Sequence, residues 1–278
     1  MRIALRFLPG LWLALLVAVP LVLVGIIALS WQAEGVPPYA PPWAGEGINP
    51  DNLRLLTEDP YYRDSLLQSL AVAALTAALC LLIAAPMGIA IARAGRGRDA
   101  LLAAVLLPFW TGFLIRIGAW IGLLRDEGWI NGILRALGWT DQPLPLLYTH
   151  GAMLLGMVHA YLPFAVLPVF AAATRLDPVL EQAAADLGAT PGRAFISITL
   201  PQLFPALAAA FLLVFIPAAG EYVIPELLGP PEATLVGRVL FQEFFQNRDW
   251  PVASALAVAL LALLIGPIIL FQRLGRDA

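Results

Sequence analysis

Residues 177–201, DPVLEQAAADLGATPGRAFISITLP, join two long apolar stretches and predict the turn on which the fold depends. Asp177 followed by Pro178 is typical of a helix start, because an aspartate side chain accepts hydrogen bonds from free amides and proline fits the first helical position. Gly188 favours the end of that helix, and the Thr-Pro pair after it favours the start of another. The segment therefore predicts a hairpin of two short helices.

The surface of this hairpin combines small, polar and apolar side chains. Ala184 and Gly188 are four residues apart, so they share a smooth strip that another protein surface can approach closely. Phe195 and Ile198 are three residues apart and form an apolar ridge. We define the docking face as Glu181, Gln182, Ala183, Ala184, Asp186, Gly188, Phe195 and Ile198. The alternative is a solvated connector between two spans, although such a connector does not need this many small and apolar residues.

The composition of the whole chain is that of a membrane protein. Of its 278 residues, 60% are hydrophobic and 13% are charged, against roughly 45–50% and about 25% in soluble domains. A single soluble core cannot hide that much apolar surface. The arginines are spread thinly, so no basic patch indicates nucleic-acid binding, and the single cysteine, Cys80, excludes a disulfide framework.

Six stretches are long and apolar enough to span the hydrocarbon as helices, each of which needs about 20 residues. They cover residues 11–30, 65–92, 100–124, 148–174, 203–223 and 252–271. Their continuous hydrophobicity favours helices over a barrel, so we expect an all-α, polytopic membrane protein with six transmembrane helices. A signal peptide is an alternative for the first stretch, but its apolar core of about 19 residues exceeds the 7–15 of a typical signal and favours a retained helix.

Arginine placement predicts the orientation of the spans. An even number of spans puts both termini on one side, and nine arginines fall on that side: Arg2, Arg6, Arg93, Arg96, Arg98, Arg175, Arg193, Arg273 and Arg276. The opposite segments are much longer but hold six arginines and most of the acidic residues. Since positive charge concentrates in cytoplasmic loops, we expect both termini in the cytoplasm.

Several kinds of catalytic chemistry are missing from the sequence. The chain has no lysine, so it contains neither a P-loop for ATP nor a Schiff-base lysine. His150 and His159 have no metal-ligand spacing, and no serine lies in a nucleophile motif. We therefore expect a transport role, with no catalytic residue, no metal site and no ATPase site in this chain.

The hairpin sequence resembles the EAA motif of ABC importer permeases, which reads Glu-Ala-Ala, three residues, Gly, nine residues and Ile-x-Leu-Pro. The matching positions are Gln182, Ala183, Ala184, Gly188, Ile198, Leu200 and Pro201. Gln182 stands where the family usually has glutamate. The stretches PFWTGFLIRIGAWIGLLRDEG, LLYTHGAMLLGMVHAYLPFAVLPV, FIPAAGEYVIPELLG and RVLFQEFFQNRDWPVASA are similar to spermidine/putrescine permeases, nearest to the putrescine subunit.

The resemblance implies a type I ABC importer permease (MetI-like) fold that imports a polyamine across the bacterial inner membrane. It implies an N-terminal span and extracytoplasmic loop over residues 1–64, and a five-helix permease core over 65–278 with a coupling loop at 177–201. The docking face would then bind a cytosolic ATPase.

The implied partners are a second homologous permease, two ABC ATPase subunits that carry ATP and Mg, and an extracytoplasmic binding protein. No cofactor is expected on this chain. Two alternatives stay open: an ABC permease for another small solute, such as iron, thiamine or an organophosphonate, and an ion-coupled secondary transporter.

Two charged residues lie at membrane depth. Arg116 costs roughly 2.5–3.5 kcal/mol at a helix centre, so we expect it to pair with a carboxylate or with carbonyl groups as a structural charge. Glu221 follows a Pro-Ala-Ala-Gly run that can loosen the helix, and with Tyr222 it could bind an ammonium group by charge and cation–π attraction. The alternatives for Glu221 are a structural Glu-Tyr pair at the end of the span or a partner for Arg116.

Trp110 and Glu226 complete the predicted substrate path. Glu226 belongs to the outward acidic surplus, which can concentrate a cationic substrate. For Trp110 the alternative is a packing or membrane-interface role, and for Glu226 an ordinary solvated rim.

Overall fold

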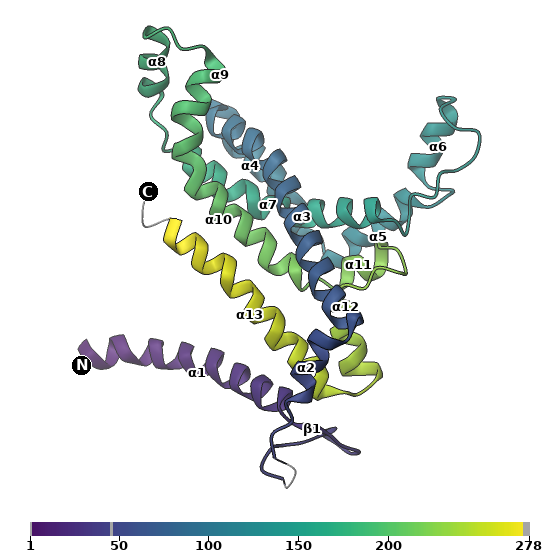
Figure 1. Cartoon of the computed structure of the whole chain (residues 1–278). Coiled ribbons are helices and arrows are strands. Elements are labelled where there is room, and N and C mark those ends of the chain that lie inside the picture. The colour runs from purple at the N-terminus through teal and green to yellow at the C-terminus, as the bar shows by residue number, and fades with distance from the viewer. Residues whose placement is uncertain (1, 45–46, 275–278) are drawn as a thin grey trace. The chain divides into compact units, whose positions relative to one another are not determined.

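Helices account for most of the computed structural model, which describes residues 2–44 and 47–274 (Figure 1). The first elements are α1 (Arg2–Ala28), β1 (Trp31–Gln32), β2 (Tyr39–Ala40), α2 (Asp51–Glu58), α3 (Pro60–Arg93), η1 (Gly95–Gly97), α4 (Arg98–Leu106), η2 (Leu107–Trp110), α5 (Phe113–Leu124) and α6 (Trp129–Ala136). They are followed by α7 (His150–Ala173), α8 (Pro178–Asp186), α9 (Pro191–Ala194), the π-helix η3 (Phe195–Thr199), α10 (Leu200–Ala219), α11 (Val223–Leu228), α12 (Val236–Phe241), the π-helix η4 (Gln242–Gln246) and α13 (Trp250–Leu274). Arg276, one of the arginines behind the predicted orientation, lies outside the described residues.

The candidate membrane spans confirm the expected all-α membrane fold. Within the described residues, five stretches are long and apolar enough to cross a membrane: Pro9–Ala28, Pro60–Arg93, His150–Ala173, Pro191–Ala219 and Trp250–Ile269. A sixth exists if Gly95–Trp110 and Phe113–Ala136, which meet at a 90° bend, form one span. That the first stretch is retained as a span stays a prediction.

The bend interrupts the stretch that the sequence predicts as one helix over residues 100–124. Thr111 and Gly112 both leave the helical region, with ψ of 146° and 139°. Pro108 lacks an amide donor and Gly112 has a low helix propensity, so the helix is weakest at this point. Irregular backbone at membrane depth is tolerated where protein or a wet cavity covers it.

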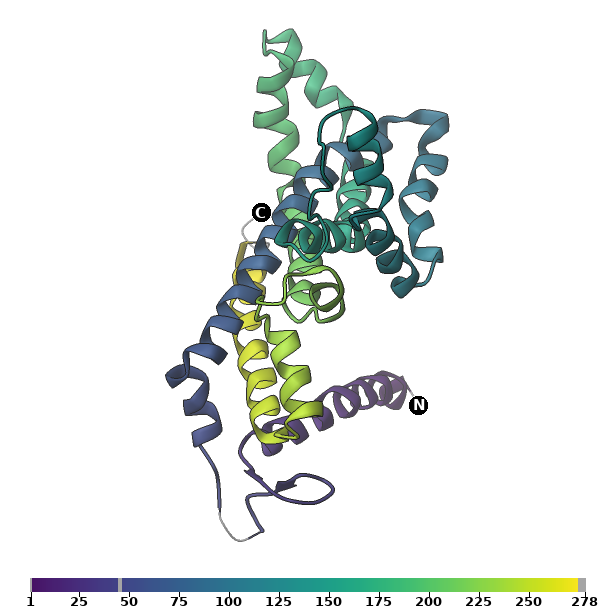
Figure 2. The ribbon, with the colours of Figure 1, turned by 90° about the vertical axis from the view of Figure 1, so that its right-hand side faces the viewer.

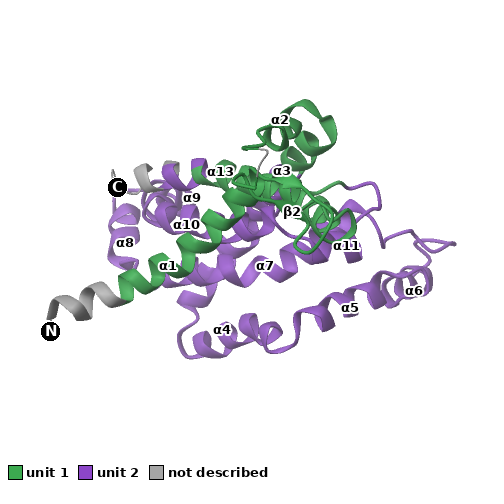
Figure 3. Cartoon of the chain, turned by 90° about the horizontal axis from the view of Figure 1, so that it is seen from below, with its two compact units in different colours: residues 1–68, 234–265 green, residues 69–233, 266–278 purple. Residues whose placement is uncertain are grey.

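The chain divides into two compact units, coloured separately in Figure 3. Unit 1 comprises Met1–Gln68 and Thr234–Ile265, and unit 2 comprises Ser69–Ala233 and Gly266–Ala278. The sequence predicts a different division, into an N-terminal span with its loop at 1–64 and a five-helix core at 65–278. That division follows the order of the spans along the chain, and it stays a prediction.

Five elements form the core of unit 1: the end of α1, α2, the start of α3, α12 and the first half of α13. Helix α12 lies beside the first half of α13 (Figures 1 and 2). Its buried members are Ala28, Leu56, Leu66, Val236, Val239, Val252, Ala255 and Leu256. The core thus joins helices that lie about 200 residues apart in the sequence.

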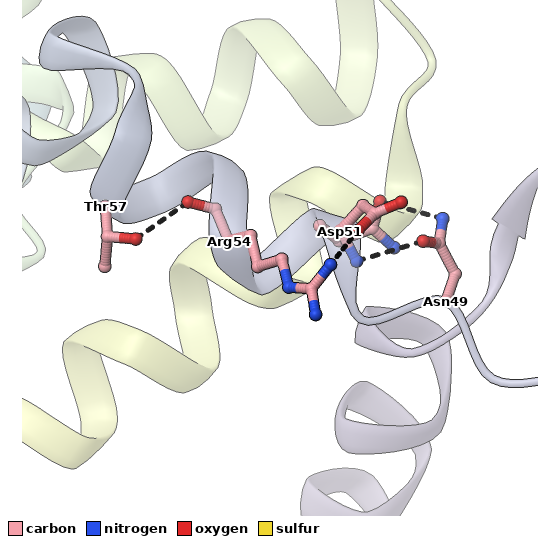
Figure 4. A network of polar contacts seen from close by, with 5 residues as sticks. Asn49, Asp51, Arg54 and Thr57 are labelled. Atoms are coloured by element: carbon pink, nitrogen blue, oxygen red, sulfur yellow. Dashed lines mark hydrogen bonds and ion pairs between the residues drawn. The ribbon is translucent and has the colours of Figure 1, made fainter.

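Buried asparagines hold the segment after α1 against that helix. The Asn52 side-chain amide donates to the carbonyl of Ala28 at 2.9 Å, a group left unpaired where α1 ends, and to the carbonyl of Ser30 at 2.8 Å in the segment that follows. Asn49 donates to Asn52 Oδ1 and accepts from the Asp51 amide (Figure 4). The loop at 31–64, whose order the composition leaves undecided, therefore carries β1, β2 and α2.

Small residues bring the helices of unit 2 close together. A Cβ atom on Gly156 of α7 would lie 2.5 Å from Leu228 Cδ1 and 3.0 Å from Ile224 Cγ2 of α11. On Gly88 of α3 it would lie 2.9 Å from Val169 Cγ1 of α7. Such close approach through small residues is how helices associate in membranes.

We predict that Gly156→Val lowers the free energy of unfolding by about 1–3 kcal/mol, because Leu228 and Ile224 are fully buried and have no room to move. Gly118→Val is the matched control, since a Cβ there meets nothing within 4 Å. Thermal unfolding of both purified variants, followed by tryptophan fluorescence, checks this. Equal melting temperatures would contradict the packing.

Candidate functional site

The hairpin at 177–201 has the predicted local structure. Asp177 Oδ1 accepts from the Val179 amide at 2.9 Å, and the Thr190 hydroxyl oxygen accepts from the Arg193 amide at 3.4 Å. Gly188 has a φ of +83°, a left-handed conformation that favours glycine. The α8 and α9 ribbons stand next to each other at one end of unit 2 (Figure 1).

The docking face is largely open to its surroundings. Helix α8 has no buried residue. Five members of the face are exposed, namely Gln182, Ala183, Asp186, Gly188 and Phe195, and three are half-buried, namely Glu181, Ala184 and Ile198. The structure therefore gathers these residues on one hairpin, as expected, while their docking role stays a prediction.

The hairpin also exposes a residue that the sequence reasoning missed. Leu187 is 90% exposed at the tip, directly before the turn at Gly188. Leu187 adds an exposed apolar side chain to the hairpin beside the docking face, and a docking role for it is likewise a prediction. Because Leu187 precedes the glycine that ends α8, the sequence could have placed it at the tip of the hairpin. Its spacing along the helix does not tell whether its side chain points toward the protein or toward solvent.

Glu181 points back into its own chain. Its Oε1 atom lies 2.6 Å from Arg93 Nη2 at the end of α3 and accepts from the Thr199 hydroxyl of η3 at 2.5 Å. The Thr199 hydrogen bond and the Arg93 charge hold the pKa of the Glu181 carboxyl below its ordinary value, although partial burial opposes them. The group is therefore ionised at neutral pH.

Arg116 lies among aromatic rings. Its guanidinium carbon is 4.9 Å from the centroid of the Phe109 ring and 5.8 Å from that of Phe113. Its Nε and Nη1 atoms are buried without a hydrogen-bond partner, and it makes no ion pair within the described residues. The guanidinium of Arg116 therefore contacts aromatic rings instead of the carboxylate or carbonyl groups that we expected. Such a ring stabilises a desolvated cation by about 2 kcal/mol.

The Glu221 carboxylate is held by the protein itself. Its Oε1 accepts from the amides of Val223 at 2.9 Å and Ile224 at 3.3 Å, so it caps the start of α11. Its Oε2 accepts from the Tyr161 hydroxyl of α7. Of the alternatives left open, the geometry favours a structural Glu-Tyr pair, with Tyr161 as the tyrosine in place of Tyr222.

The other predicted path residues come from separate elements. Trp110, at the end of η2, is 90% exposed. Glu226 is exposed on α11, and Tyr222 is half-buried just before it. A substrate role for these residues and for Glu221 stays a prediction. Within residues 2–44 and 47–274, no three potential metal ligands come together.

The sequence is similar to those of known transport proteins. The chain matches the family model of binding-protein-dependent transport system inner membrane components over residues 2–276. The spermidine/putrescine transport system permease protein PotB of Haemophilus influenzae is 35% identical over 267 residues, covering 95% of this chain and 91% of that protein.

Two solved structures share the fold. A chain of a bacterial alginate ABC transporter, solved with an alginate pentasaccharide-bound periplasmic protein, aligns with a TM-score of 0.77 at 16% identity, covering 99% of this chain and 94% of that one. A chain of the MetNI methionine ABC transporter aligns with a TM-score of 0.56 at 19% identity, covering 77% and 94%. These likenesses confirm the expected MetI-like fold.

We predict that Glu221→Ala and Tyr161→Phe each lower the free energy of unfolding by about 1–2 kcal/mol, because each removes a partly buried hydrogen bond to a carboxylate. The double variant should melt no lower than Glu221→Ala, since both changes remove the same contact. Tyr148→Phe, on an exposed tyrosine, is the control. Thermal unfolding measures all four variants, and additive losses in the double variant would disprove the pairing.

Proposed function

The chain belongs to the family of binding-protein-dependent transport system inner membrane components, and we propose that it carries polyamines such as putrescine or spermidine into the cytoplasm. It is a permease subunit of an ABC importer, as the hairpin motif implied. The observation that carries the substrate proposal is the 35% identity with the polyamine permease over 95% of this chain.

The proposed assembly contains this chain, a second homologous permease, two cytosolic ATPase subunits and an extracytoplasmic binding protein. ATP and Mg bind to the ATPase subunits. The lack of lysine in this chain supports that division, because a P-loop needs a lysine to reach the phosphates. The arginine distribution supports an orientation with the hairpin and both termini in the cytoplasm.

The proposed mechanism makes the docking face the contact with one ATPase, except for Glu181, whose carboxylate is engaged by Arg93 and Thr199 of its own chain. Nucleotide binding closes the ATPase pair and moves the hairpin, and the spans then open outward to receive substrate from the binding protein. The contact must favour one state of the spans over the other, because docking with equal affinity for both shifts no equilibrium. A continuous helical stretch from Pro191 to Ala219 offers one route, since it joins the hairpin directly to α10.

We predict that Leu187→Asp weakens copurification of the ATPase at least about tenfold, because a charge replaces an exposed apolar residue at the proposed contact. Leu187 is a better test position than Gly188, where any side chain also strains the turn. Leu137→Asp is the control, since Leu137 is 59% exposed on the loop side opposite the hairpin in the proposed topology. Normal copurification with Leu187→Asp would count against docking at the tip.

The substrate proposal is tested by uptake. We expect the complex, reconstituted in vesicles with its binding protein, to accumulate labelled putrescine or spermidine only when ATP is supplied, and not to accumulate sulfate. Selective uptake of sulfate, or polyamine uptake without an ATPase subunit, would overturn the proposed function.

A further inference from the structure

The Glu181 carboxylate joins three elements that meet at the hairpin end of unit 2. Glu181 lies on α8, Arg93 is the last residue of α3, and Thr199 is the last residue of η3. Both contacts reach the same oxygen, Oε1, at 2.6 Å from Arg93 Nη2 and 2.5 Å from Thr199 Oγ1. Thr199 is 1% exposed, so its hydroxyl is a fixed donor that orients the carboxylate toward Arg93.

The ion pair bridges a region with little side-chain packing. Two pockets that open to solvent, of about 390 Å³ and about 360 Å³, are both lined by Arg93 and Glu181. Helix α8 buries none of its residues. Apolar packing therefore does little to hold α8 against the end of α3, whereas the charge-assisted contact crosses the gap directly.

The three neighbouring helices are connected to the hairpin in different ways. Helix α10 continues from it through α9 and η3, and α7 reaches it through a short non-helical link at residues 174–177. Helix α3 lies 88 residues away in sequence from Glu181 at Arg93, so it has no such covalent link. The Arg93–Glu181 ion pair connects α3 to the hairpin without a covalent bond.

We propose that Arg93, Glu181 and Thr199 form a clamp through which movement of the hairpin is passed to α3. Glu181 is then a positioning residue for coupling, held by its own chain, rather than a contact with the ATPase. This inference rests on the proposed function, because it requires that an ATPase moves the hairpin.

The exposure of the Arg93 and Glu181 side chains indicates that the clamp contributes little to the stability of the fold. The side chains of Arg93 and Glu181 are 55% and 32% exposed. Ion pairs at such positions contribute little to stability, because solvent screens them and two long side chains lose freedom. Removing either charge should therefore leave the chain folded and able to assemble, so that an effect on coupling can be measured separately.

The test uses the full complex in vesicles and compares parent, Arg93→Gln, Glu181→Gln, the double variant, Arg93→Lys and the charge swap Arg93→Glu with Glu181→Arg. The matched control is Arg96→Gln, which removes an arginine three residues from Arg93 that makes no ion pair within the described residues. Three quantities are measured: copurified ATPase, ATP hydrolysis stimulated by the loaded binding protein, and uptake.

We expect each neutral variant to keep its ATPase and to lose about fivefold in uptake per ATP hydrolysed, a change typical of residues that carry coupling. The double variant should be no worse than either single variant, because both remove one interaction. Arg93→Lys and the charge swap should recover most of the uptake, and Arg96→Gln should match the parent.

The outcomes separate the clamp from the proposed function. If the neutral variants match the parent, or if the charge swap is no better than the single variants, the clamp is wrong while the transport function stands. If Glu181→Gln loses the ATPase and the charge swap does not restore it, Glu181 contacts the ATPase and the clamp is wrong. If the parent itself binds no ATPase, the proposed function fails and the clamp fails with it.

Discussion

The need to pair backbone polar groups in an apolar solvent governs this structure. Hydrocarbon offers no hydrogen bonds, so a spanning chain must satisfy its amides and carbonyls within helices. The exposed groups at helix ends then need side chains: Asn52 pairs with carbonyls at the end of α1, Glu221 pairs with amides at the start of α11, and Asp177 does so for α8. Polar side chains thus fix the end of α1 and the starts of α8 and α11.

Local features were predictable from the sequence, and contacts between distant residues were not. Asp177, Thr190 and Gly188 act on neighbours within three residues, so the hairpin could be read directly. Arg93, which pairs with Glu181, and Tyr161, which pairs with Glu221, come from other helices 88 and 60 residues away, and no periodicity of the sequence indicates these pairs. The bend after η2 was not predicted, because the sequence stays hydrophobic through it. The aromatic rings around Arg116 were not predicted either, because tertiary packing brings them together.

These long-range contacts change the interpretation of two charged residues. Both belong to sets that sequence reasoning assigned to intermolecular roles, docking for Glu181 and substrate binding for Glu221. In the structure each carboxylate accepts hydrogen bonds from its own chain. Charges that are engaged internally suit the transmission of movement between helices, whereas the exposed members of the docking face, with Leu187 at the tip, remain available to a partner.

In the proposed mechanism the 177–201 hairpin couples an ATPase to the spans. The most direct measurement is the structure of the complete complex determined with and without a bound nucleotide analogue. We expect Leu187 and the exposed part of the docking face to be buried against the ATPase in both states, and the ends of α3 and α10 to move with the hairpin from one state to the other. A hairpin that stays in water, or one that moves while both helix ends remain in place, would contradict it.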